Sequence, residues 1–176
     1  MDAVGFRYTI DANDLLVDAS PAYFQFAAEN RWRGAGASLG EPLWSFVSGA
    51  TMRRLQRALV RRVRTSGRTI VLPFRCDSPE ARREMTIELC RGPHGSVSFT
   101  ARLLAEQPRS RPALLDPGAA PRPGQVEMCG WCDRFLVDAQ WVEVEVASRR
   151  LALTGARRPA ITHGICPDCA QLLASA

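Results

Sequence analysis

Apolar and polar residues alternate along three segments in the middle of the chain, which is typical of strands that bury one face. The apolar positions are Ile70, Leu72, Phe74 and Cys76, then Met85, Ile87 and Leu89, and last Val97, Phe99, Ala101 and Leu103. If the three faces meet one core, a hairpin through 77–82 pairs Phe74 with Met85. Pro73 cannot donate a hydrogen bond to a ladder, so the first of these strands is expected at a sheet edge.

The turn between the second and third segments sets the rest of the register. A three-residue loop at 92–94 pairs Ile87 with Phe99. The opposite face then carries three charged residues in one row, namely Arg75, Glu84 and Arg102. In that row Glu84 is expected between two guanidinium groups.

Two shorter apolar segments, 6–10 and 15–17, flank a turn rich in Asp and Asn and predict a hairpin near the start of the chain. Ser20 followed by Pro21 is typical of a helix start, because serine caps the first turn and proline fits its first position. This helix is expected to run through about Asn30.

A second helix is predicted over about 51–65, with Gly67 as its stop. Its apolar face consists of Met52, Leu55, Leu59 and Val63. Residues 51–68 also hold seven arginines and no acidic residue: Arg53, Arg54, Arg57, Arg61, Arg62, Arg64 and Arg68. Arginine forks match phosphates and carboxylates, so this helix is a candidate for an acidic partner or for phosphate. A merely solvated helix face is the alternative.

Prolines at 108, 112, 117, 121 and 123 interrupt the stretch 106–125, which has few apolar residues. Such a stretch continues neither a helix nor a central strand, so we expect a linker. It divides the chain into a domain at 1–105 and a smaller module at 126–176. We expect the domain to fold without the module.

Four of the six cysteines form two Cys-x-x-Cys pairs: Cys129 with Cys132, and Cys166 with Cys169. Two such turns supply the four sulfurs that structural zinc prefers, so we expect one closed zinc site. The 33 residues between the pairs must hold structure of their own. A reversible thiol switch is the alternative, and His163 is an alternative ligand.

Composition narrows the range of possible functions further. The chain has 176 residues and a net charge of +5, and all 23 basic residues are arginines. No run approaches the ~20 apolar residues of a membrane helix, and the N-terminus lacks the basic and apolar pattern of a leader. We therefore expect a cytoplasmic protein that does not bind a membrane. With two histidines, no nucleophile elbow and no phosphate-cradling glycine loop, it is not expected to be an enzyme.

Residues 5–104 resemble a PAS domain in their order of two strands, helices and three strands. The segments that carry the likeness are Ile10 to Val17, Ala19 to Tyr23 and Leu39 to Trp44. The tail resembles a C-terminal extension of bacterial PAS-containing signalling proteins in Cys129-Gly130-Trp131-Cys132, Trp141 and Thr162-His163-Gly164-Ile165-Cys166-Pro167-Asp168-Cys169.

The resemblance implies an α+β fold: a five-stranded antiparallel sheet in strand order 2-1-5-4-3 with helices on one face, which puts the third strand at an edge. It also implies sensing or protein association. A small-molecule ligand of unknown identity would occupy a cavity lined by Tyr23, Phe26, Trp44 and Phe46, unless these aromatics fill it themselves. Haem is disfavoured because 51–65 lacks a histidine, and flavin photochemistry because the Arg-Cys pair at 75–76 falls in a later strand.

These observations predict a non-catalytic signalling or regulatory adaptor with a protein partner, and a homodimer stays open. The alternative, from a different functional class, is a zinc-dependent nucleic-acid-binding regulator that uses the arginine-rich helix at 51–68. It ranks second because residues 126–176 hold five arginines against six acidic residues.

Overall fold

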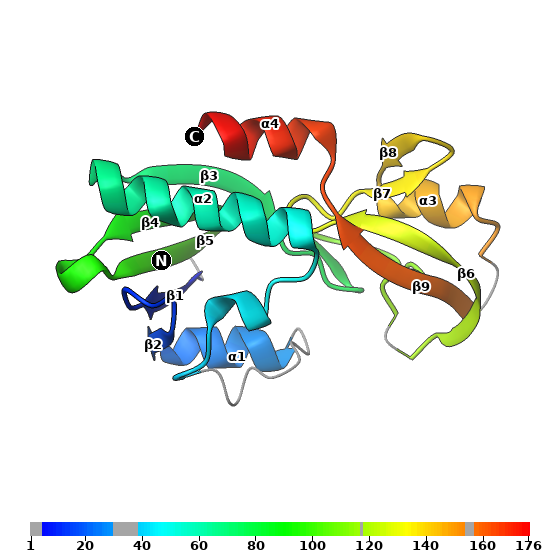
Figure 1. Cartoon of the computed structure of the whole chain (residues 1–176). Helices are drawn as coiled ribbons and strands as arrows, with labels where there is room; N and C mark the ends of the chain where they lie inside the picture. Colours follow the sequence, from blue (N-terminus) through cyan, green and yellow to red (C-terminus); the bar gives the residue numbers. More distant parts are fainter. Residues whose placement is uncertain (1–4, 30–38, 117, 154–156) are drawn as a thin grey trace.

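The structure is a computed structural model that describes residues 5–29, 39–116, 118–153 and 157–176. Five strands form an antiparallel sheet in the order β2-β1-β5-β4-β3 (Figure 1). Their bounds are β1 Gly5–Ile10, β2 Leu16–Ala19, β3 Ile70–Arg75, β4 Ala81–Arg91 and β5 Val97–Pro108. The α+β class, the five-stranded sheet and the edge position of Pro73 are confirmed.

Two helices and a short 3-10 turn pack on one face of this sheet. They are α1 (Pro21–Glu29), η2 (Leu43–Ser45) and α2 (Ala50–Ser66). Ser20 Oγ accepts the backbone N–H of Tyr23 at 3.3 Å, which caps α1 as expected. Gly67 ends α2 at φ 69°, a left-handed conformation that glycine adopts without strain. Asn30, where α1 was expected to end, lies outside the described residues.

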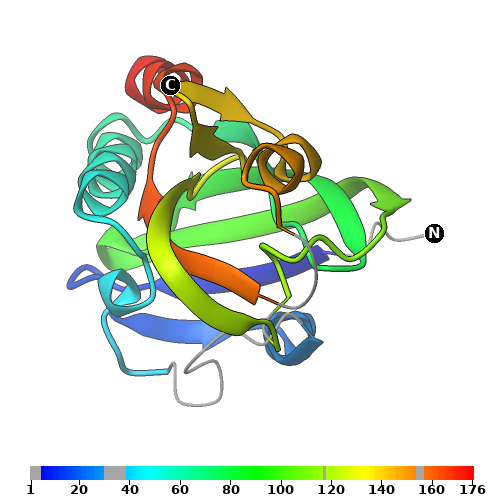
Figure 2. The ribbon, with the colours of Figure 1, turned by 90° about the vertical axis from the view of Figure 1, so that its right-hand side faces the viewer.

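A second sheet lies beyond the edge strand β3, in the order β8-β7-β6-β9. Its strands are β6 (Ala120–Cys129), β7 (Phe135–Val137), β8 (Gln140–Val142) and β9 (Arg157–Gly164). Figure 2 shows β6 and β9 in front of the five-stranded sheet. Two helices accompany it, α3 (Val144–Arg150) and α4 (Pro167–Ser175). The long spacer between the cysteine pairs therefore does hold structure of its own.

The register of the first sheet is as expected at one turn and different at the other. Phe74 lies opposite Met85, which confirms the first hairpin. The pairing of Ile87 with Phe99 is wrong, because Ile87 lies opposite Ala101. The turn has five residues, 92–96, closed by a hydrogen bond from Gly92 N–H to the carbonyl of Ser96 at 2.9 Å. Those two extra residues shift the pairing by two positions.

The expected charged row is also wrong. Arg75 does lie opposite Glu84, but a bulge between Glu84 and Met85 changes the register on the other side, where Glu84 faces Ala105. Arg102 instead pairs with Glu88 at 3.1 Å. Glu84 therefore does not lie between two guanidinium groups from neighbouring strands.

The predicted linker has more structure than its prolines suggest. β5 continues through Pro108, and β6 begins at Ala120, so strand residues occupy both ends of the stretch 106–125. Leu114 between them is fully buried and joins the core of the second sheet. The strand ends thus differ from the boundaries drawn from the sequence, while the independent folding of the two parts stays a prediction.

Candidate metal centre

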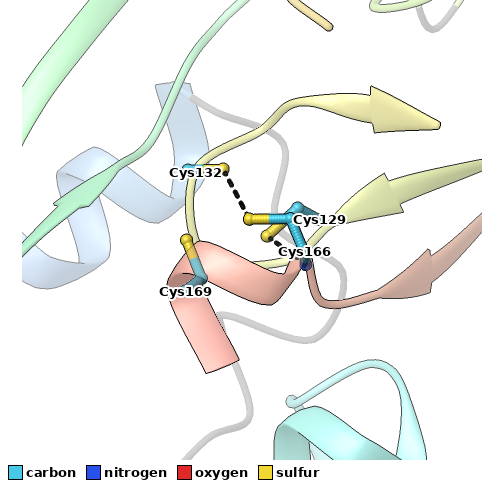
Figure 3. Close-up of side chains that lie close together, drawn as sticks. All are labelled: Cys129, Cys132, Cys166 and Cys169. Atoms are coloured by element: carbon cyan, nitrogen blue, oxygen red, sulfur yellow. Dashed lines mark hydrogen bonds between the residues drawn. The ribbon is translucent and has the colours of Figure 1, made fainter. Parts of the chain in front are cut away.

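The four cysteines converge because two parallel strands end side by side. β6 and β9 pair in parallel, with Cys129 opposite Gly164. β6 ends at the first cysteine of its pair, and β9 ends two residues before Cys166, so both Cys-x-x-Cys turns emerge at the same end of the sheet. Cys166 caps α4, and Cys169 lies in its first turn. Figure 3 shows the four side chains directed at one another.

The spacing of the sulfurs fits one tetrahedral metal ion. All four Sγ atoms lie within 4.8 Å of one another, and Cys132 Sγ lies 3.7 Å from Cys166 Sγ. A tetrahedron with zinc–sulfur bonds of about 2.3 Å has edges of about 3.8 Å. Cys129, Cys166 and Cys169 are buried, so the donor set suits a closed, structural site.

Hydrogen bonding within the cluster divides the thiols into acceptor and donors. The thiols of Cys132 and Cys169 and the backbone N–H of Cys166 all hydrogen-bond to Cys129, which lowers the pKa of Cys129 well below its usual range. The same bond to Cys129 raises the pKa of Cys132 to about 12, and the pKa of Cys169 also rises. Four thiolates therefore require a cation to neutralise them, which is what zinc supplies when bound.

His163 does not belong to the four-cysteine group. It lies on β9 opposite Met128, with its side chain exposed. Its backbone instead packs against Gly49, the residue before α2. A Cβ atom at Gly49 would lie 2.7 Å from the carbonyl oxygen of His163, so only glycine fits there.

Trp131, inside the first Cys-x-x-Cys turn, binds the edge strand β3. Its indole Nε1–H donates to the carbonyl of Pro73 at 2.8 Å, and its own carbonyl accepts the N–H of Arg75 at 3.0 Å. The carbonyl of Pro73 and the N–H of Arg75 point away from β4, toward the side of β3 on which a further strand would pair. This Cys-x-x-Cys turn, residues 129–132, is called the metal loop below, and it occupies the free edge of the sheet. The indole ring of Trp131 lies 5.9 Å from the ring of Phe74.

A buried ion network joins the same two parts of the molecule. The carboxylate of Asp77, 1% exposed, pairs with both Arg75 and Arg109. Arg75 also reaches Glu143, just before α3, at 2.6 Å. The N–H of Asp77 donates to the carboxylate of Asp133 at 2.8 Å, and burial raises the pKa of Asp133 to about 7.

Sequence reasoning missed this network, because its members are far apart along the chain. Arg109 fell in the presumed linker, and Arg75 was assigned to a different row. The one available signal was Asp133 directly after Cys132, where a polar residue at positive φ continues the turn.

The metal centre and the five-stranded sheet share one hydrophobic core. Its buried members include Cys129, Trp131, Cys166, Cys169 and Leu173 together with Met52, Leu59, Leu72, Met85 and Leu89. The cysteines therefore pack against α2 and the sheet rather than within a separate small core. A second core, around Phe135 and Leu114, lies under α3.

The four proposed cavity residues are divided between two places. Tyr23 and Phe26 join an aromatic cluster in which Phe6 lies 4.8 Å from Phe26. Trp44 is buried, and its Nε1–H donates to Asp14 at 2.6 Å. Phe46 is half-buried just beyond η2.

Tyr23, Phe26 and Trp44 pack against other side chains of the core, and none of the four aromatics lines the surface hollow beside β1. That hollow, about 470 Å³, is lined by Gly5, Phe6, Arg7, Ser20, Pro21, Ala22, Thr100, Ala101 and Arg102. Whether a ligand binds among the four aromatics stays a prediction.

Comparison with known proteins adds no family to this description: no protein-family model matches the chain, and a search of curated proteins finds no match. Among the helices of the described residues, none combines the length and the apolar character that crossing a membrane requires. The molecule is an α+β protein whose four clustered cysteines could hold a metal ion such as zinc.

Proposed function

We propose that this protein is a non-catalytic regulatory adaptor, in which a PAS-like sensing or interaction domain is held in shape by a structural zinc module. The observation that carries the proposal is the contact of Trp131 with Pro73 and Arg75. A loop whose conformation depends on the metal contacts the sheet edge directly. The state of the metal site is thereby coupled to the sheet.

The chemistry of the donor set supports a structural rather than a catalytic role. Four sulfurs complete a tetrahedron and leave no open position for water or substrate. His94 lies exposed in the turn between β4 and β5, whereas His163 lies on β9, so the two histidines stand on different sheets. An adaptor that binds a protein partner uses the surface of the sheet and helices instead.

Metal analysis and hydrogen exchange test the proposal together. Native mass spectrometry of the purified protein should show one zinc per chain, lost in Cys132→Ser and kept in Cys90→Ser, which changes a cysteine on β4 instead. Removal of zinc by a chelator should release the protected amide of Arg75 and deprotect β3. The proposed coupling between the metal site and the sheet would be excluded if the purified protein contains no zinc. It would also be excluded if hydrogen exchange of the β3 amides is the same with and without the chelator.

A nucleic-acid-binding regulator is the second candidate, favoured by one observation. Arg54 and Arg61 on α2 are exposed to solvent, as a phosphate-binding helix requires. The experiment at the end of the next subsection separates this function from the adaptor.

A further inference from the structure

Helix α2 carries a row of positive charge that the fold leaves open. Between Glu41 and Asp77 the chain has no acidic residue. Four arginines of α2 have partners within the protein. Arg53 donates to the carbonyl of Val47, Arg57 lies over the ring of Trp44, Arg62 donates to the carbonyl of Ala174, and Arg64 pairs with Asp14.

The remaining arginines form what we call the arginine ridge: Arg54, Arg61 and Arg68. All three are exposed, and within the described part of the chain none has a hydrogen-bond or ion-pair partner through its side chain. Arg54 and Arg61, both within α2, stand seven residues apart, a spacing of two helical turns or about 10.5 Å along the helix axis. Arg54 and Arg61 lie opposite the buried face that contains Leu59 and Val63, and Arg68 follows just after the helix end.

The surroundings of the ridge limit its width to one helix. On one side α4 lies along α2 (Figure 1), and its sequence contains no basic residue. On the other side η2 contributes no basic residue either. Arg57, a further exposed arginine of α2, already lies over the ring of Trp44. The unpaired arginines of the helix, Arg54 and Arg61, therefore form one row that fits a single line of carboxylates.

We propose that the arginine ridge of α2 binds an acidic α-helix of a protein partner. Two carboxylates seven residues apart on that helix match the two-turn spacing of Arg54 and Arg61. The guanidinium fork donates two parallel hydrogen bonds to a carboxylate, so each arginine fits one acidic side chain. This inference rests on the adaptor function proposed above and names the class of its partner.

The test uses a synthetic, helix-forming peptide of 21 residues with glutamate at every seventh position of one face. Binding to the zinc-loaded full-length protein is followed by fluorescence anisotropy at 0.15 M salt. The variant Arg54→Glu/Arg61→Glu should bind at least about tenfold more weakly, because two attractive pairs become repulsive. A peptide with arginine in place of glutamate should bind this variant better than it binds the unmodified protein.

The matched control is Arg149→Glu/Arg157→Glu, which makes the same change in net charge at two exposed arginines outside α2, on α3 and at the start of β9. It should keep the affinity for the acidic peptide within about twofold, since exposed charges more than a Debye length away are screened. Equal weakening by both variants, or no binding of the peptide by the unmodified protein, would overturn the proposal.

A 20-base-pair DNA duplex is measured in parallel. Salt-dependent duplex binding that exceeds peptide binding and is lost in Arg54→Glu/Arg61→Glu would replace the acidic helix by nucleic acid. Zinc content and β3 exchange are measured on the same variants and should not change. An arginine ridge that does not bind the acidic peptide is therefore distinguishable from a metal site that is not coupled to the sheet.

Discussion

Substitution of Trp131 tests whether the metal loop holds the edge of the five-stranded sheet. Trp131→Phe keeps an aromatic ring but removes the indole N–H, so the carbonyl of Pro73 loses its donor. Because this bond is only partly shielded from water, its loss should cost about 0.5–1.5 kcal/mol of unfolding free energy. For a chain of this length that corresponds to a decrease of roughly 1–6 °C in Tm.

Trp131→Ala should cost more, because it also empties a site that is 6% exposed and packed against Phe74. Deletion of a buried tryptophan side chain costs about 3–5 kcal/mol. Trp141→Phe is the control: Trp141 is half-buried on β8, so its replacement should cost less than about 1 kcal/mol.

Urea unfolding of the zinc-loaded variants, followed by circular dichroism, measures these differences. Hydrogen exchange at the amide of Arg75 reports on the edge itself, because that amide donates to the carbonyl of Trp131. The reasoning is refuted if Trp131→Phe is as stable as Trp141→Phe and exchange at Arg75 is unchanged in Trp131→Ala.

Three further predictions follow from the same interface. Removal of zinc should destabilise both sheets in one transition, because the cysteines share a core with the first sheet. This outcome would go against the independent folding expected from the sequence, and separate transitions by circular dichroism would contradict it. Asp77→Asn should cost about 1.5–3 kcal/mol, because Arg75 and Arg109 lose a charged acceptor while they keep Glu143 and Glu145, whereas Asp18→Asn on the surface should cost less than about 1 kcal/mol in the same urea titration. Gly49→Ala should lower Tm more than Gly40→Ala: both have positive φ, but only at Gly49 does the added Cβ meet the carbonyl oxygen of His163; equal Tm values would argue against that contact.

The local pattern of the sequence predicted elements well where each residue's neighbours decide its conformation. The alternation of Ile70, Leu72 and Phe74 identified a strand and its buried face, and Gly67 marked the end of α2. The predicted strand register is wrong at the second turn. The hydrogen bond from Gly92 to Ser96 that closes this turn depends on turn geometry, which the alternation of apolar and polar residues does not encode. The bulge at Glu84 has the same effect.

The prolines of the presumed linker show a second kind of error. Pro121 lies in β6, and Pro123 falls where the pairing with β9 is irregular, between Pro121 and Gln125. Proline is tolerated at such irregularities, so a proline-rich stretch is compatible with strand ends. The parallel pairing of β6 with β9 joins residues more than 30 positions apart, and no local pattern indicates it.

The convergence of the four cysteines could be predicted, because spacing constrains two Cys-x-x-Cys turns, but their place against β3 could not. Pro73 indicated only that β3 is an edge strand. An edge leaves backbone groups unpaired, and proteins cover such edges or shorten them. Here β2 is a short edge of four residues, whereas the longer edge β3 is covered by Trp131. The first Cys-x-x-Cys turn therefore covers the edge at which another chain could pair, and removal of a bound metal is expected to expose Pro73 and Arg75 to such pairing.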